Sequence, residues 1–152
     1  MTSTFASSDL EVLRNRTFDE IALGDSESIE RTLTAADIQL FAAMSGDINP
    51  QHIDAEFAAS TRFHGVIAHG MWGAALLSAV LGTRLPGPGT IYVGQTLKFR
   101  APVRVGDTLT VKVTVKSRTA ERHQLVLDCS CTNQDGKAVI AGEATVVDPT
   151  ER

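Results

Sequence analysis

The hydrophobic and polar positions follow two different periods along the chain, helical before residue 90 and strand-like after it. In the first part, Ile38 and Ala42 recur at the four-residue spacing of an amphipathic helix. Thr34 can cap the free N–H groups at the start of this helix, and Gly46 suits the left-handed residue that commonly ends one. The pattern therefore predicts a helix that ends at Gly46, with Asp47 directly beyond it.

The strongest prediction of a long helix covers His69 to Leu85, where the residues are small and apolar nearly all round. A helix without a polar face is normally wrapped by other structure. Trp72 is expected to pack in the core, and the run Pro86-Gly-Pro-Gly89 ends the segment. A shorter helix over residues 54–59, capped by Asp54, is predicted ahead of it.

After residue 90, apolar and polar residues alternate, which indicates strands. An earlier strand is predicted at Ser28–Thr32, and the turn signal Asp135-Gly136 joins the last two strands as a hairpin. The fold class is therefore α+β, with an antiparallel sheet of about five strands and a long buried helix against its concave face. The later predicted strands are Ile91–Phe99, Asp107–Lys116, Gln124–Thr132 and Lys137–Val147.

Length and charge narrow the class of protein. A chain of 152 residues with 43% apolar residues suits a single domain with a core of its own. We expect residues 1–10, rich in Ser and Thr, to be a flexible N-terminal tail and residues 11–152 to be the domain. A net charge of −4 argues against nucleic-acid binding, which favours a basic face. The start is not typical of a signal peptide, and no apolar run reaches 18 residues, so we expect a cytoplasmic protein without a membrane span.

The only cysteines, Cys129 and Cys131, lie two residues apart in an alternating stretch. On a strand both point to one face, where neighbours rarely form a disulfide, and two thiols are too few for a zinc site. We expect buried, reduced thiols, as in a cytosolic protein.

A carboxylate, Asp47, and an imidazole, His52, are the candidate chemical groups. Pro50 extends Asn49 and is expected to stop any further helix, so both groups lie on one short turn from which they can reach one water molecule. Asn49 can fix the turn through its own side-chain hydrogen bonds. Histidine titrates near neutral pH and can accept or donate a proton. The alternative is that Asp47 caps the turn and His52 is a surface or structural residue.

The segment Ser45-Gly-Asp-Ile-Asn-Pro-Gln-His52, with Ala58 six residues further on, resembles the hydratase-2 motif of MaoC-like (R)-specific enoyl-CoA hydratases. Further matches follow in register at Ile67-Ala-His-Gly-Met71, Leu77-Ser78, Ile91-Tyr-Val-Gly94 and Val105-Gly-Asp107. The resemblance covers roughly residues 34–147. Met44 and Gln51 depart from the usual pattern, which leaves the substrate range less defined than the reaction type.

The resemblance implies a hot-dog fold and the reversible hydration of trans-2-enoyl-CoA to (R)-3-hydroxyacyl-CoA. By position, Asp47 and His52 match the catalytic pair that holds the reacting water. Gly70 matches the glycine whose N–H binds the thioester oxygen, and Ser78 matches a serine near the catalytic pocket. It also implies a homodimer and an acyl-CoA substrate. The reaction needs no redox cofactor and no metal.

Several residues have competing interpretations. Ser78 could equally be a small helix-packing residue, and His69 is expected to hydrogen-bond locally rather than act in catalysis. A metal site built from Asp47, His52, Asp54 and His69 is conceivable, but their spacing is not a metal signature, so we expect none. His64 and His123 are expected to be solvated, as are the scattered basic side chains, although the latter could meet the phosphates of coenzyme A.

Three other functions remain open from the sequence. A thioesterase would use the same fold and the same oxyanion site, and a (3R)-hydroxyacyl carrier-protein dehydratase performs the same chemistry on another carrier. A non-catalytic acyl-CoA-binding subunit belongs to a different class. The intact pair of Asp47 and His52 argues against that class, because binding alone needs no proton-transfer groups.

Overall fold

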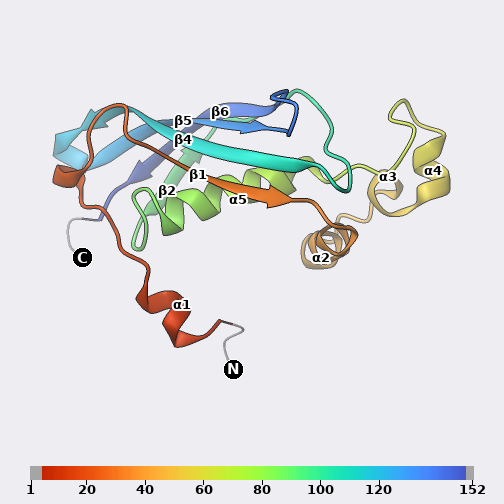
Figure 1. Cartoon of the computed structure of the whole chain (residues 1–152). Coiled ribbons are helices and arrows are strands. Elements are labelled where there is room, and N and C mark those ends of the chain that lie inside the picture. The colour runs from red at the N-terminus through yellow and green to blue at the C-terminus, as the bar shows by residue number, and fades with distance from the viewer. Residues whose placement is uncertain (1–4, 150–152) are drawn as a thin grey trace.

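The computed structural model describes residues 5–149, which form a curved antiparallel sheet with one long helix lying along it (Figure 1). The strand order is β1-β4-β5-β6-β2, and the short β3 pairs with β6. This is the hot-dog arrangement predicted above, with β3 added to the five main strands. The strands are β1 (Ser26–Thr32), β2 (Ile91–Gln95), β3 (Lys98–Phe99), β4 (Thr108–Thr119), β5 (Gln124–Thr132) and β6 (Ala138–Val147).

The core lies between the inner face of the sheet and helix α5 (Gly70–Thr83). Alternate residues of β4 point inward and are fully or almost fully buried, from Leu109 to Val115, while Lys112 between them is exposed. Burying such side chains is the main stabilising contribution to a fold of this size. The prediction that Trp72 packs in the core is confirmed, since it is only 7% exposed.

Helix α5 is covered by the sheet on one side only. Its side chains Leu77, Val80 and Leu81 are buried in the core. The opposite side carries a stripe of exposed residues, which we call the α5 stripe, made of Met71, Ala75, Ser78 and Gly82. The prediction that the helix is wrapped all round is therefore wrong for a single chain. The physical reason is that one sheet can cover only one face of a helix.

The strand predicted at 91–99 is divided into β2 and β3. The division occurs where the carbonyl group of Thr96 turns toward Gly142 on β6: a Cβ atom at position 142 would lie 1.9 Å from the Thr96 oxygen. The Thr96 N–H still donates to Glu143 O at 2.9 Å, and Gln95 and Lys98 keep one register against β6. Only a glycine allows this approach, because it has no side chain.

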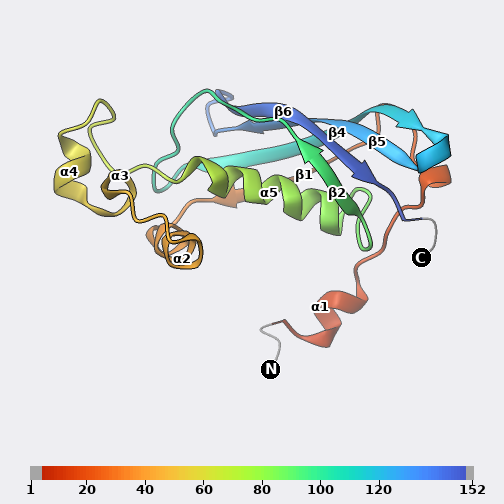
Figure 2. The ribbon, with the colours of Figure 1, turned by 180° about the vertical axis from the view of Figure 1, so that it is seen from behind.

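Three helices gather at one end of the sheet, around the start of α5 (Figures 1 and 2). They are α2 (Ala35–Ser45), α3 (Pro50–Ile53) and α4 (Ala55–Ala59). The predicted caps are confirmed: Thr34 Oγ1 accepts from Asp37 N–H, Gly46 has φ 78°, and Asp54 accepts from Phe57 N–H. These caps fix the ends of the short segments that carry Asp47 and His52.

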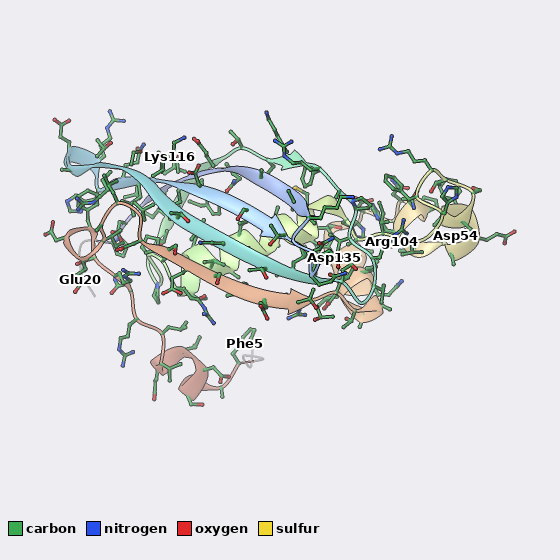
Figure 3. The ribbon with its side chains drawn as sticks, turned by 45° about the horizontal axis from the view of Figure 1, so that its top comes forward. Phe5, Glu20, Asp54, Arg104, Lys116 and Asp135 are labelled. Carbon is green, nitrogen blue, oxygen red and sulfur yellow. The ribbon has the colours of Figure 1, made fainter. Side chains whose placement is uncertain are left out.

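Among the described residues, the opposite end carries two single-turn helices, η1 (Phe18–Glu20) and η2 (Ala120–Arg122). In Figure 3, Glu20 lies at this end and Asp54 at the other. Residues 1–4 of the predicted tail lie outside the described residues, and residues 7–10 belong to α1 (Ser7–Glu11), in which no residue is buried. The tail and its boundary stay a prediction. Within residues 5–149, no helix has the length and apolar character that crossing a membrane requires.

Candidate active site

Asp47 is held where α2 ends. Gly46 closes the helix in the left-handed conformation, and the Asp47 N–H donates to Ser45 Oγ at 3.1 Å. Ser45 in turn donates its hydroxyl proton to Phe41 O at 2.7 Å. The carboxylate oxygen Oδ1 of Asp47 accepts from the Asn49 N–H at 3.2 Å. The carboxylate is therefore positioned by its own turn, and Asp47 itself is exposed.

His52 lies on α3, and the start of this helix corrects the sequence prediction for Pro50. The prediction that Pro50 stops any further helix is wrong, because Pro50 occupies the first position of α3. That position needs no N–H donor, and the fixed φ of proline suits it. Asn49 has φ −50° and ψ 123°, which lies outside the extended region predicted for it, and its side chain accepts from Gln51 N–H at 3.1 Å, which caps the helix.

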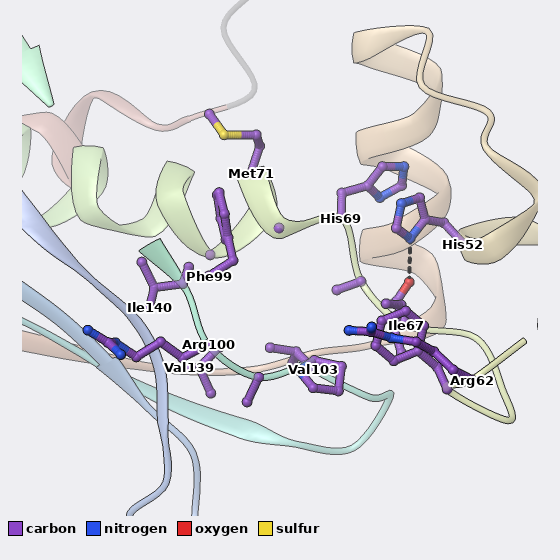
Figure 4. Close-up of a pocket in the computed structure, with 16 residues that line it drawn as sticks. His52, Arg62, Ile67, His69, Met71, Phe99, Arg100, Val103, Val139 and Ile140 are labelled. Carbon is purple, nitrogen blue, oxygen red and sulfur yellow. Dashed lines mark hydrogen bonds between the residues drawn. The ribbon is translucent and has the colours of Figure 1, made fainter. Parts of the chain in front are cut away.

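The imidazole of His52 has a fixed orientation. Its Nδ1 lies 2.7 Å from Ile67 O, and because a carbonyl oxygen can only accept, Nδ1 carries the proton. Nε2 of a neutral ring is then left with a free lone pair, which a general base requires. Figure 4 shows this hydrogen bond and the ring beside the cavity.

His69 contributes more than the local hydrogen bond expected for it. The residue is 3% exposed, and its Nε2 lies 2.8 Å from Asp47 O, 22 positions earlier in the chain. The ring stacks on His52 with centroids 4.0 Å apart and contacts Phe41 at 4.8 Å. The expectation of a local bond is therefore wrong: His69 connects the start of α5 to the turn that carries Asp47.

A cavity of about 460 Å³ opens beside His52, between the start of α5 and the segment around β3 (Figure 4). Its lining is mostly apolar, with two basic side chains, Arg62 and Arg100, among the lining residues. Such a lining suits an acyl group at one part of a ligand and negative charge at another. The apolar members include Ile67, Met71, Phe99, Val103, Val139 and Ile140.

Gly70 lies at the first position of α5 and lines the same cavity as His52. The first N–H groups of a helix have no partner within it and carry the positive end of the helix dipole. A Cβ atom at position 70 would lie 2.8 Å from the ring of Phe99. The absence of a side chain therefore lets the Phe99 ring approach the start of the helix closely.

The other residues predicted for the site do not line the cavity. Asp47 is not in the cavity wall, but one of its carboxylate oxygens lies within 4.8 Å of a ring nitrogen of His52 and of His69. Asp54 is not part of this group. Ser78 is exposed on the α5 stripe and does not line the cavity of the single chain. Gln51 is buried, and its side chain donates to Gly65 O, so it ties α3 to the following loop.

Sequence reasoning missed the side chains that complete the cavity, above all Phe99 and Ile140. Both lie on strands whose alternation predicts only that one face is buried. Their role depends on where β3 and β6 pass α5, which no local pattern encodes. His64 is exposed, as predicted. His123 is not simply solvated, since it stacks on Phe18 at the far end of the molecule.

The two cysteines do not belong to the site. Both are free and buried, as predicted. Burial raises the pKa of the Cys131 thiol to about 12, and the neighbouring Cys129 adds to this shift. A neutral thiol is a poor nucleophile. The thiols are therefore not candidates for proton exchange with a substrate.

Comparison with known proteins places this geometry in a family. The model of the MaoC like domain matches residues 24–133. An (R)-specific enoyl-CoA hydratase of Rhodospirillum rubrum is 52% identical, over 87% of this chain and 91% of its own length. A 3-hydroxybutyryl-CoA dehydratase of Methylorubrum extorquens is 46% identical, over 92% of this chain and 88% of its own length.

Solved structures agree with these sequence matches. An R-hydratase of Pseudomonas aeruginosa, in unliganded form, has a TM-score of 0.86 and 44% identity, covering 90% of this chain and 88% of that one. The (R)-hydratase of A. caviae involved in PHA biosynthesis has a TM-score of 0.82 and 40% identity, covering 85% and 98%. The structural similarity therefore extends over most of the chain.

Proposed function

This chain belongs to the MaoC-like family, and from that premise we propose that it catalyses the reversible hydration of a trans-2-enoyl-CoA to the (R)-3-hydroxyacyl-CoA. It is then a hydro-lyase of fatty acid metabolism. The observation that carries the proposal is the 52% identity to an (R)-specific enoyl-CoA hydratase over nearly the whole chain. The geometry supports it independently: His52 and Gly70 line one cavity, and a carboxylate oxygen of Asp47 lies within 4.8 Å of a ring nitrogen of His52.

In the mechanism we propose, the Gly70 N–H donates a hydrogen bond to the thioester oxygen. Electron density moves toward that oxygen, which makes the β-carbon electrophilic. The unpaired N–H groups and the dipole at the start of α5 stabilise the enolate that develops, as oxyanion donors do. Removing one such donor typically costs about 2.7–4 kcal/mol of barrier.

We assign to Asp47 and His52 the task of holding the water molecule and moving its protons. The water oxygen forms the new bond to the β-carbon, one water proton passes to the pair, and a proton from the pair reaches the α-carbon. The free lone pair on Nε2 of His52 supports this role, because Nδ1 is already engaged with Ile67 O. Asn49 supports the pair indirectly by capping α3.

The cavity supports an acyl thioester as the substrate. Its apolar side chains would contact the acyl chain, while Arg62 and Arg100 lie where negatively charged groups of coenzyme A could be met. No redox step occurs in a hydration, since water adds without a change in the electron count. The proposal therefore includes no redox cofactor and no catalytic metal.

The decisive experiment follows crotonyl-CoA and the purified protein. We expect loss of the enoyl absorbance, formation of 3-hydroxybutyryl-CoA of R configuration on chiral analysis, and little free thiol. Predominant thiol release would favour a thioesterase, and binding without a product would favour a non-catalytic subunit. Hydration of a crotonyl carrier-protein thioester but not of crotonyl-CoA would favour the carrier-protein dehydratase, the activity for which a relative in Solanum lycopersicum, 31% identical, is named.

We further propose that two copies form a homodimer through the α5 stripe. Its members are small or flexible, so that two helices could approach closely, and the edge strand β2 beside it exposes Ile91, Tyr92 and Val93 (Figure 2). Exposed apolar strips of this kind commonly mark an interface. In such a dimer Ser78 would be covered by the partner copy. The free thiols are consistent with the cytoplasmic location that we expect.

A further inference from the structure

The two histidines beside the cavity share a hydrogen-bonding arrangement that is typical of metal ligands. His52 donates its Nδ1–H to Ile67 O, and His69 donates its Nε2–H to Asp47 O, at 2.7 and 2.8 Å. Histidines that bind metals almost always donate their other ring N–H to a carbonyl or carboxylate, which fixes the ring and the tautomer. Both rings therefore present their remaining nitrogen as a lone pair: Nε2 in His52 and Nδ1 in His69.

The remaining nitrogen of His69 is unusual because it is buried without a partner. His69 is 97% buried, and among the described residues its Nδ1 has no hydrogen-bond partner. Figure 4 shows the His69 ring directly over that of His52. A buried acceptor without a donor is unfavourable, and such groups in native proteins call for an explanation.

The chemistry of the cluster favours a cation over a water molecule. Asp47 adds a carboxylate, and one of its oxygens, a ring nitrogen of His52 and a ring nitrogen of His69 all lie within 4.8 Å of one another. A water molecule has only two protons to donate and cannot serve both imidazole lone pairs and the carboxylate at once. A divalent ion accepts all three lone pairs at once, and one carboxylate with two imidazoles is a common ligand set for Zn²⁺ and neighbouring transition metals.

We propose that Asp47, His52 and His69 form a binding site for a divalent transition-metal ion, with Zn²⁺ as its representative, and that the ion inhibits the enzyme. Donor atoms around a tetrahedral Zn²⁺ lie about 3.4 Å apart. The cluster must therefore contract: the stacked rings of His52 and His69 must tilt until both lone pairs point at one ion, and the Asp47 carboxylate must move toward them. A bound ion would occupy both groups that hold the reacting water. This inhibition, but not the binding, rests on the proposed function.

The binding experiment uses Co²⁺ and Zn²⁺ as probes of the full chain. We expect one ion per chain by equilibrium dialysis and a visible Co²⁺ absorption band of the four- or five-coordinate type. His69→Gln should weaken the binding at least tenfold. His64→Asn is the matched control, because it removes an exposed histidine outside the cluster and asparagine tolerates its positive φ of 55°. Circular dichroism checks that both variants fold, and Asp47→Asn replaces His69→Gln if the latter does not.

The activity experiment measures hydration of crotonyl-CoA with and without Zn²⁺. Inhibition that EDTA reverses and that crotonyl-CoA weakens by competition is the expected result. Equal metal binding by the wild type, His69→Gln and Asp47→Asn would overturn the site, and a thiolate-to-cobalt charge-transfer band would place the ion on the cysteines instead. Binding at the cluster without inhibition would overturn the inhibitory role. If the protein hydrates no substrate, the proposed function fails, while the Co²⁺ titration still decides the metal site.

Discussion

A single hydrogen bond, from Nδ1 of His52 to the carbonyl oxygen of Ile67, determines which nitrogen of that ring is free to accept a proton. The bond joins α3 to the segment that leads into α5, so the position of the free nitrogen depends on both. His69 acts from the other side by stacking on the ring. The acid–base group is thus oriented by main-chain atoms and ring packing, in addition to its neighbour Asp47.

The first prediction concerns the proposed catalytic pair. Asp47→Asn and His52→Gln should each lower kcat for crotonyl-CoA by about 10²–10⁴-fold, the usual contribution of a general acid or base. Both variants keep similar size and polarity, so the thermal midpoint should change little. Stopped-time assays and a thermal melt check this, with His64→Asn as a histidine variant outside the cavity. Turnover close to that of the wild type in either variant would remove that residue from the mechanism.

The second prediction concerns the close approach at Gly70. In Gly70→Ala the added methyl group would lie 2.8–2.9 Å from Phe99 ring atoms, so the ring must move. Phe99 is 53% exposed and can move without disturbing the core. We expect kcat/KM to fall by at least tenfold, because the methyl group and the displaced ring obstruct the donor at the cavity, while the unfolding free energy changes by less than about 1 kcal/mol.

The control for Gly70 is the double variant Gly70→Ala/Phe99→Ala. Removing the ring relieves the contact and leaves only the effect of the methyl group. The effect of Gly70→Ala on kcat/KM is measured in two backgrounds, the wild type and Phe99→Ala. We expect the loss of kcat/KM to be smaller in the Phe99→Ala background. Full activity in Gly70→Ala would show that this N–H is not the oxyanion donor.

At the level of elements, the helix caps are what hold the pair in place. Asn49 caps α3, and Asn49→Ala should lower stability by about 1 kcal/mol, the usual effect of losing such a cap. Because α3 carries His52, kcat should fall as well. Thr34→Ala is the matched control: it removes a cap of similar strength at the far end of α2 and should lower stability alone. Urea unfolding and crotonyl-CoA turnover distinguish the two, and equal activity in both variants would count against the positioning role.

The elements that sequence predicted well are those with local signals. The caps at Thr34 and Asp54, the end of α2 at Gly46 and the alternation of β5 all reflect interactions within a few residues. The predicted strand Gln124–Thr132 has the observed bounds, because its inward residues form an uninterrupted alternating pattern.

The elements that sequence predicted less well depend on contacts between distant segments. The division of the strand at 91–99 follows from Thr96 meeting Gly142 across the sheet. The bond from His69 to Asp47 O joins residues 22 positions apart. The signal at Pro50 is ambiguous, because a proline can follow the end of one helix and also occupy the first position of the next. The motif indicates Asp47 and His52 as the candidate pair, whereas the residues of the cavity wall can be identified only from the fold.

For the whole molecule, an ionisable group far from the cavity should govern how stability depends on pH. Asp148 is 2% exposed, and neither carboxylate oxygen has a hydrogen-bond partner among the described residues. Burial raises the pKa of Asp148 from 3.8 to about 7; the Glu20 carboxylate adds to the shift and the Arg118 guanidinium opposes it. The main-chain N–H of Asp148 donates to His123 O. Glu20, whose charge acts on Asp148, lies at the end of the molecule opposite Asp54 (Figure 3).

The sign of the effect follows from proton linkage. Between about pH 4 and pH 7 the folded state keeps a proton on Asp148 that the unfolded state has lost, so its contribution to stability is complete below pH 4 and falls as the pH rises to about 7. Asp148→Asn cannot ionise and should show a smaller loss of unfolding free energy between pH 5 and pH 8. Urea unfolding at both values checks this, and an unchanged difference would exclude Asp148 as the cause.

The last prediction tests the homodimer through the α5 stripe. Ala75 lies in the middle of the stripe and is exposed in the single chain, so Ala75→Arg should place a charged side chain where two helices would meet. Burying that charge without a partner is unfavourable, and we expect light scattering to show a monomer where the wild type is a dimer. Ala120→Arg, at an exposed position of η2, is the matched control and should leave the mass unchanged. A dimer that survives Ala75→Arg would place the interface elsewhere, with the exposed edge of β2 as the next surface to alter.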